Sequence, residues 1–257
     1  MSQHPSVDDT RLSTQDYLDH LDADVEALIA AATDLEAVVP GCPDWSVGDL
    51  LSHVVGVYRH KSAALETDLE PVLGFESWDA IEPGQDVREV LRTEYSRLRA
   101  LLTARPAETP TWTWWPAEQT IGFWQRRMAQ ETAVHRWDAQ SAVLGVDGAD
   151  PIDDDLADDG VDELLSWLTW PWGEEALDDA AGQTVLVSSG VHSWTLAFTP
   201  TRVTVEGGVG DAVSLVAGPP SGLLLHLWGR PGNHDVATGG DVVALSLLQQ
   251  GLAMVVS

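Results

Sequence analysis

The sequence predicts a two-domain protein, in which an N-terminal bundle of four helices precedes a smaller C-terminal α+β domain. Three observations support this fold class. Four stretches of helical apolar spacing fill the first part of the chain, a polar Asp-rich stretch follows at 146–155, and short β-rich runs come after it. Because linkers between domains are typically polar and exposed, we place the domains at residues 1–147 and 148–257.

The first two predicted helices cover residues 14–38 and 46–68. In the first, apolar residues recur at the spacing of one helix face, and a Pro-Gly pair follows. The second begins at Ser46, and the spacing of Ser46 to Asp49 is typical of a capping box. His53 lies among the apolar positions of this second helix, close to its buried stripe.

Two further helices are predicted at residues 86–104 and 121–144, with Gly145 ending the last one. The connection between them is rich in tryptophan: Trp112, Trp114, Trp115. These rings could form an aromatic rim over the bundle, although packing on the second domain is the commoner role of such a cluster. Four helices of similar length suit an antiparallel, up-down bundle.

The C-terminal domain mixes helices with short strands that are separated by Gly, Pro and Asp turns. The spacing predicts helices at 154–169, 221–228 and 241–252. It predicts strands at 183–188, 193–199, 202–206 and 212–216. We therefore expect a small, mostly antiparallel sheet.

The charge balance argues against two classes of partner. The chain carries 41 acidic against 13 basic residues, a net charge of −28, and Lys61 is its only lysine. Such a field repels nucleic-acid phosphates and anionic lipid surfaces, so we expect neither partner. No apolar run is long enough to span a membrane, and one cysteine excludes internal disulfides. These features predict a soluble cytoplasmic protein.

The stretch around Glu131 and His135 carries the clearest chemical signal. The two residues are four apart on a predicted helix, so they share one face and can bind the same ion. His53 on another helix would complete a set of two His and one Glu, which is an established catalytic zinc set with an open fourth position. The alternatives are a chance surface pair and a hydrogen-bonded core histidine.

Two further residues have open interpretations. Asp138 could accept a hydrogen bond from the imidazole of His135, or it could pair with Arg136 or Arg127. Arg230 follows an apolar helical run and precedes a Pro-Gly pair, so its guanidinium could project from a helix end and bind a carboxylate. A structural salt bridge is the alternative for Arg230.

Four segments resemble a known family. They are residues 45–53 (WSVGDLLSH), 131–138 (ETAVHRWD), 227–230 (LWGR) and 239–241 (GGD). The first two resemble the DinB-like superfamily. More closely, the chain is similar to the actinobacterial mycothiol-dependent maleylpyruvate isomerase family, whose C-terminal signature the last two resemble.

The resemblance implies a DinB-like metal-binding bundle and a C-terminal α/β domain of the sterol-carrier-protein-like kind. It implies that His53, Glu131 and His135 bind a divalent metal, zinc or alternatively nickel, and that Arg230 belongs to the active site. It also implies mycothiol as the thiol cosubstrate of an isomerase or S-transferase acting on a small electrophilic, carboxylate-bearing substrate. A metal-dependent hydrolase and a non-enzymatic small-molecule-binding protein remain as alternatives. Either a monomer or a homodimer is expected.

Overall fold

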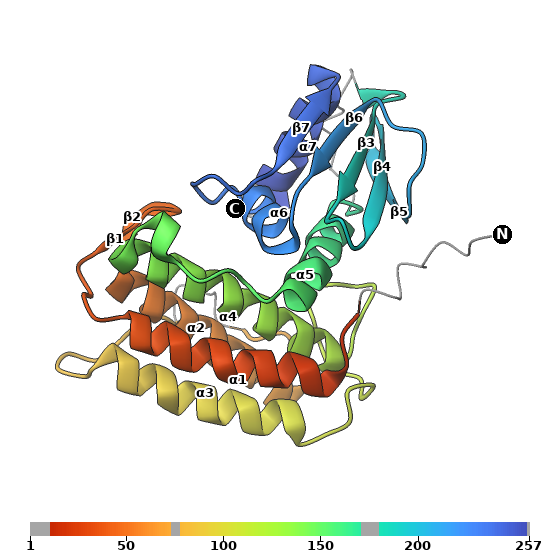
Figure 1. The fold of residues 1–257 in the computed structure, drawn as a ribbon. Coiled ribbons are helices and arrows are strands. Elements are labelled where there is room, and N and C mark those ends of the chain that lie inside the picture. The colour runs from red at the N-terminus through yellow and green to blue at the C-terminus, as the bar shows by residue number, and fades with distance from the viewer. Residues whose placement is uncertain (1–10, 73–77, 171–179, 256–257) are drawn as a thin grey trace. The chain divides into compact units, whose positions relative to one another are not determined.

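The contacts of the chain divide it into two compact units (Figure 1). The computed structural model describes residues 11–72, 78–170 and 180–255. One unit covers Ser13–Asp150, and the other takes up the chain from Pro151 onward. The first unit is mainly helical and the second contains a sheet, which confirms the predicted two-domain α+β architecture. The domain boundary between residues 147 and 148 remains a prediction.

In its described residues, the first unit contains four long helices, a two-stranded hairpin and one turn of 3-10 helix at Val146–Gly148. The helices are α1 (Thr14–Ala31), α2 (Val47–Thr67), α3 (Val87–Thr103) and α4 (Ile121–Leu144). They lie side by side, with α1 packed mainly on α4, and α2 packed mainly on α3 and also on α4 (Figure 1). The four predicted helices are all present. The DinB-like, up-down description of their arrangement stays a prediction.

The start of α2 follows the predicted capping box. The hydroxyl Oγ of Ser46 accepts the N–H of Asp49 at 3.2 Å, and the carboxylate of Asp49 accepts the N–H of Ser46 at 2.9 Å. Oγ of Ser46 also donates to Oδ2 of Asp49 at 2.6 Å, and this hydrogen bond, followed by the one from the Ser46 backbone, lowers the pKa of Asp49. Two otherwise unsatisfied donors are satisfied, which defines the first turn of α2 and places His53 near the start of the helix.

The predicted extension of the first helix to residue 38 is wrong, because α1 ends at Ala31. Beyond it, the carboxylate Oδ1 of Asp34 accepts the N–H of Glu36 at 3.1 Å, a local hydrogen bond that competes with helix formation. The chain then forms strand β1 (Val38–Val39), which pairs with β2 (Cys42–Ser46). Helical apolar spacing alone could not detect this local competition.

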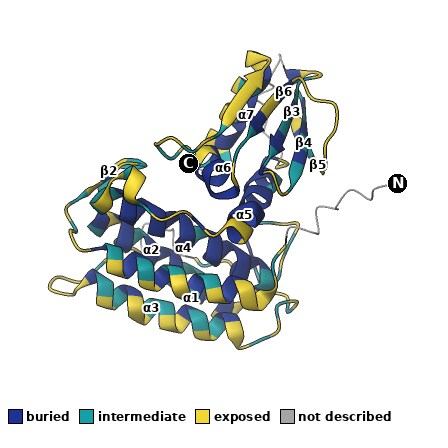
Figure 2. Ribbon diagram, in the orientation of Figure 1, coloured by how far each residue is buried: buried dark blue, intermediate teal, exposed yellow. Residues whose placement is uncertain are grey.

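Helix α4 is buried on nearly all sides, unlike α1 and α3 (Figure 2). It begins at the cap residue Thr120 and ends at Gly145, whose φ of +80° suits a residue without a Cβ. Charged side chains therefore enter the interior of the unit on this helix: Arg126, Arg127, His135, Arg136, Asp138. Buried charges are costly unless they are paired, so this helix is where a functional site is expected.

The described part of the second unit contains a five-stranded sheet and three helices. The helices are α5 (Asp154–Trp167), α6 (Pro220–Leu227) and α7 (Val242–Val255). The strands are β3 (Thr184–Ser188), β4 (Ser193–Thr199), β5 (Arg202–Gly207), β6 (Ser214–Ala217) and β7 (Ala237–Gly240). In the order β5-β4-β3-β6-β7, only β3 and β6 run parallel, so the mostly antiparallel prediction is confirmed.

Strand β7 was not predicted, because its Ala-Thr-Gly-Gly sequence lacks alternating apolar residues and every residue in it is exposed. In β3 and β4, by contrast, alternate residues are buried. On this buried face the indole N–H of Trp194 donates to Asp162 of α5 at 3.0 Å. The sterol-carrier-protein-like description of this unit stays a prediction. Among the described residues, no helix is long and apolar enough to cross a membrane.

Candidate metal centre

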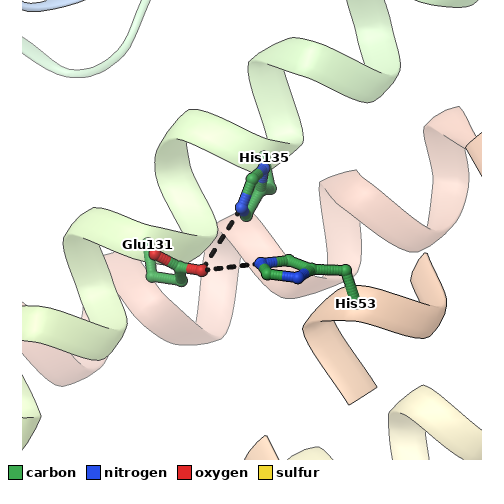
Figure 3. Close-up of side chains that lie close together, drawn as sticks. All are labelled: His53, Glu131 and His135. Atoms are coloured by element: carbon green, nitrogen blue, oxygen red, sulfur yellow. Dashed lines mark hydrogen bonds and ion pairs between the residues drawn. The ribbon is translucent and has the colours of Figure 1, made fainter. Parts of the chain in front are cut away.

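The structure brings His53, Glu131 and His135 together inside the first unit (Figure 3). Oε1 of Glu131 lies 3.4 Å from Nε2 of His53 and 3.2 Å from Nε2 of His135. One candidate donor atom from each residue lies within 4.8 Å of the other two. His53 comes from α2, and the other two side chains come from successive turns of α4, as the spacing predicts.

Two imidazoles and one carboxylate are a donor set that zinc can bind. Zinc holds imidazole nitrogens and carboxylate oxygens at about 2.0–2.2 Å, so two ligand atoms in a tetrahedral site are separated by about 3.3 Å. The two distances from Oε1 of Glu131 match this separation. Side-chain exposures of 26% for His53, 16% for Glu131 and 10% for His135 show that the cluster is not fully sealed from solvent. Catalytic zinc sites typically use three protein donors and leave the fourth position open.

Two neighbouring residues orient the donors. The guanidinium of Arg127 donates from Nη2 to Oε2 of Glu131 at 2.7 Å, so Oε1 is the oxygen that faces the histidines. Oδ2 of Asp138, a fully buried residue, lies 3.1 Å from Nδ1 of His135. This contact places the proton of a neutral His135 on Nδ1 and leaves Nε2 as the donor to an ion.

These contacts answer the open question about Asp138. Asp138 faces His135, while Arg136 pairs with Asp24 through a contact of 2.9 Å from Nε to Oδ1. Arg127 pairs with Glu131 instead. Arg127 and Glu131 are four residues apart on α4, a spacing that favours an ion pair on one helix face and that the sequence analysis did not use. The ring of Trp45, also missed, lies 4.8 Å from the ring of His53.

The protonation of the cluster reflects its burial and its charges. Burial alone would raise the pKa of Glu131, but the charge of His135, hydrogen bonds from both histidines and the charge of Arg127 hold it well below its usual range. Burial alone would lower the pKa of His135, but Glu131 and Asp138 raise it to about 9. Without a metal, His135 is therefore protonated at neutral pH and forms an ion pair with Glu131.

Arg230 lies in the other unit, just after α6. Its guanidinium lies 5.8 Å from the centre of the Trp228 ring, and Nη1 donates to the Trp228 carbonyl at 3.2 Å. Arg230 also lines a cavity of about 480 Å³, together with Trp228, His226, Gln249 and the apolar side chains of α7. The structure thus places Arg230 at a cavity within its own unit.

The predicted tryptophan cluster lies in the first unit. Trp112 and Trp114 line a second cavity, of about 530 Å³. The indole N–H of Trp124 on α4 donates to the carbonyl of Trp112 at 2.9 Å. Trp115 contacts Trp114 with ring centres 6.0 Å apart. Within this unit, the cluster packs on α4 and borders a cavity.

Comparison with known proteins confirms the resemblance found in the sequence. The family model of the mycothiol maleylpyruvate isomerase N-terminal domain matches residues 18–140, which include all three donors. Two crystal structures of a mycothiol-dependent maleylpyruvate isomerase, one of them a histidine-to-alanine mutant, are similar to the chain with a TM-score of 0.65 each. They are 14% and 13% identical to it, and each similarity covers 93% of this chain and 97% of the other. A search of curated protein sequences finds no match.

Proposed function

Because residues 18–140 belong to the mycothiol maleylpyruvate isomerase N-terminal domain family, we propose that the chain is a metal-dependent and mycothiol-dependent isomerase or S-transferase. The observation that carries the proposal is the convergence of His53, Glu131 and His135. Two imidazole nitrogens and one carboxylate oxygen suit zinc, with nickel as the alternative. The substrate class is a small electrophile that carries a carboxylate.

Each residue of the site has a role in the proposal. A bound divalent metal supplies a Lewis acid that favours the thiolate form of the cosubstrate, which is the nucleophilic form of a thiol. His53, Glu131 and His135 bind that metal. Asp138 holds the Nδ1 proton of His135, and Arg127 holds Oε2 of Glu131. Both contacts keep the donor atoms aimed at one point.

Arg230 is proposed to bind the carboxylate of the substrate. Guanidinium groups bind carboxylates through two parallel hydrogen bonds, and the cavity beside Arg230 offers apolar and polar walls for a small molecule. In a chain of net charge −28, an anionic substrate needs such a local cation. We keep the cytoplasm as the proposed location.

Two measurements test the proposal. Elemental analysis of protein purified without chelator should find about one zinc or nickel ion per chain, and a metal content near zero contradicts the proposed site. Turnover of a maleyl-type electrophile should require mycothiol. Unchanged turnover without thiol would favour metal-assisted hydrolysis, and metal binding without turnover of either kind would favour a binding protein.

A further inference from the structure

The cavity beside Arg230, here called the Arg230 cavity, has a volume of about 480 Å³. Its walls come from the end of α6 and the residues that follow it, from β6 and β7, and from α7. A volume of several hundred Å³ accommodates a small organic molecule. The side chains of these walls therefore indicate which class of molecule the cavity takes.

One face of α7 forms an aliphatic wall of the Arg230 cavity. The lining residues of this helix are spaced at i, i+3, i+4, i+7 and i+8, which places them on one side of the helix. They are Leu245, Leu248, Gln249, Leu252 and Ala253. Val216 of β6 and Leu227 of α6 add two further aliphatic side chains. An aliphatic chain of a ligand can therefore be buried against this wall.

The charge of the cavity wall is opposite to that of the chain as a whole. The chain has 41 Asp and Glu residues, yet none lies among the described residues that line the cavity. Arg230 is the only Arg or Lys among them. Burial, and then the charge of His234, lower the pKa of the lining residue His226, so His226 is neutral at pH 7. The result is a local positive charge in a strongly acidic chain, which favours an anionic ligand group.

The end of α6 fixes the position of Arg230. The N–H of Gly229 donates to the carbonyl of His226 at 3.0 Å. The N–H of Arg230 donates to the carbonyl of Leu225 at 2.9 Å. With the φ of +68° at Gly229, these two hydrogen bonds form a Schellman motif, a common way to end a helix. The guanidinium lies 5.8 Å from the centre of the Trp228 ring, so the cation is positioned before a ligand binds, which reduces the ordering cost of binding.

We propose that the Arg230 cavity binds an amphipathic monocarboxylate, with its carboxylate on the guanidinium of Arg230 and its aliphatic chain against α7. The inference rests on the carboxylate-binding role proposed above for Arg230, and it narrows the substrate to a carboxylate-bearing electrophile with an apolar chain. A short dicarboxylate fits these walls poorly, because its second carboxylate would be buried against leucine side chains. An uncharged apolar molecule gains nothing from the guanidinium.

Binding of octanoate to the full-length, chelator-treated protein tests this inference. Titration calorimetry compares octanoate with butyrate, which has a shorter chain, and with succinate, which has two carboxylates. Each buried CH2 group should tighten binding about three- to fourfold, so octanoate should bind at least about tenfold more tightly than either competitor. If butyrate or succinate binds as tightly as octanoate, the proposal is overturned.

A substitution that fills the cavity locates the binding site. Ala253 lines the cavity from an exposed position on α7, so Ala253→Phe occupies the cavity without disturbing the buried core. Met254→Phe is the matched control, because Met254 is 55% exposed and does not line the cavity. Octanoate affinity should fall by about tenfold or more in Ala253→Phe and should be unchanged in Met254→Phe. Equal affinities of the wild type and Ala253→Phe would place octanoate elsewhere and overturn the proposal.

Removal of the cation tests the carboxylate contact. Arg230→Gln should weaken octanoate binding by about tenfold or more and should leave the binding of octanamide, its uncharged analogue, unchanged. An equal loss for both ligands would show that Arg230 only supports the wall, and it would overturn the proposal. Because these titrations use neither metal nor thiol, their outcome is separate from that of the enzyme proposal. Octanoate binding without any turnover contradicts the enzyme proposal alone, whereas turnover together with a preference for succinate contradicts this inference alone.

Discussion

Oε1 of Glu131 lies 3.4 Å from Nε2 of His53, a residue 78 positions earlier in the chain. The contact joins α2 to α4 in the interior of the helical unit. It is the relationship on which the proposed metal site depends, because it turns a helical Glu-His pair into a set of three donors.

Removal of one donor should abolish metal binding without unfolding the helical unit. His53→Ala leaves two of the three proposed ligands, Glu131 and His135. Because position 53 is partly exposed, it tolerates a smaller side chain. We expect a metal content near zero by elemental analysis and an unchanged far-UV circular dichroism spectrum. His20→Ala, at a histidine on α1 outside the cluster, is the matched control and should keep its metal. Full metal content in His53→Ala would remove His53 from the site.

Asp138→Asn should weaken metal binding and leave the ligand set intact. The carboxylate of Asp138 fixes the proton on Nδ1 of His135, whereas an amide can donate to Nδ1 and move that proton to Nε2. We expect a loss of about 10–100-fold in metal affinity, as is typical of such supporting contacts. Competition with a chelator measures it. An affinity equal to that of the wild type would show that Asp138 only fills space.

Metal affinity should rise with pH up to about 9. The pKa of His135 is raised to about 9 by Glu131 and Asp138 against the effect of burial, so a metal must displace a proton from this imidazole below that pH. Affinity should increase by roughly tenfold per pH unit between pH 6.5 and 8.5, with about one proton released per ion. Calorimetry in buffers of different ionisation enthalpy counts the proton. A flat affinity profile would contradict the ion pair.

The stability of the metal-free protein should fall as the pH rises toward 9, whereas metal affinity should rise. His135 has a raised pKa in the folded state, so its contribution is complete below its unfolded value of about 6.5 and is lost as the pH rises through about 9. Glu131 has a lowered pKa, so its contribution is present above about 4.5 and is lost as the pH falls toward its folded pKa. Urea unfolding of chelator-treated protein at pH 5.5 and 9.5 should therefore give the higher free energy of unfolding at pH 5.5.

Gly222→Ala should destabilise the second unit and disturb Arg230 indirectly. A Cβ at Gly222 in α6 would collide with the backbone carbonyl of His234. The imidazole Nε2 of His234 in turn lies 2.9 Å from the carbonyl oxygen of Arg230. Overpacking of this kind costs about 1–3 kcal/mol, so Tm should fall by several degrees. Gly239→Ala, where no atom lies within 4 Å of the new Cβ, is the control. Equal melting temperatures for the two variants would contradict the close packing at α6.

The sequence alone determined most of the elements that carry the site. The capping pair of Ser46 and Asp49 placed α2, and the apolar spacing up to Gly145 placed α4 with its Glu131 and His135 on one face. These are local features, because caps and helical periodicity depend on residues only a few positions apart. The same local rules were wrong at the end of α1 and could not detect the all-exposed strand β7.

Only the tertiary structure decided which partners the site residues have. Asp138 had three candidate partners in the sequence. It lies beside His135 on the same helix, and the packing of α1 on α4 pairs Arg136 with Asp24 instead. The distance between His53 and Glu131 depends on how α2 packs against α4, and the position of Lys61 beside Trp124 depends on the same contact. The spacing of side chains along one helix determines which residues share a face. Which residues of another helix contact that face depends on how the helices pack to bury apolar surface across the whole unit.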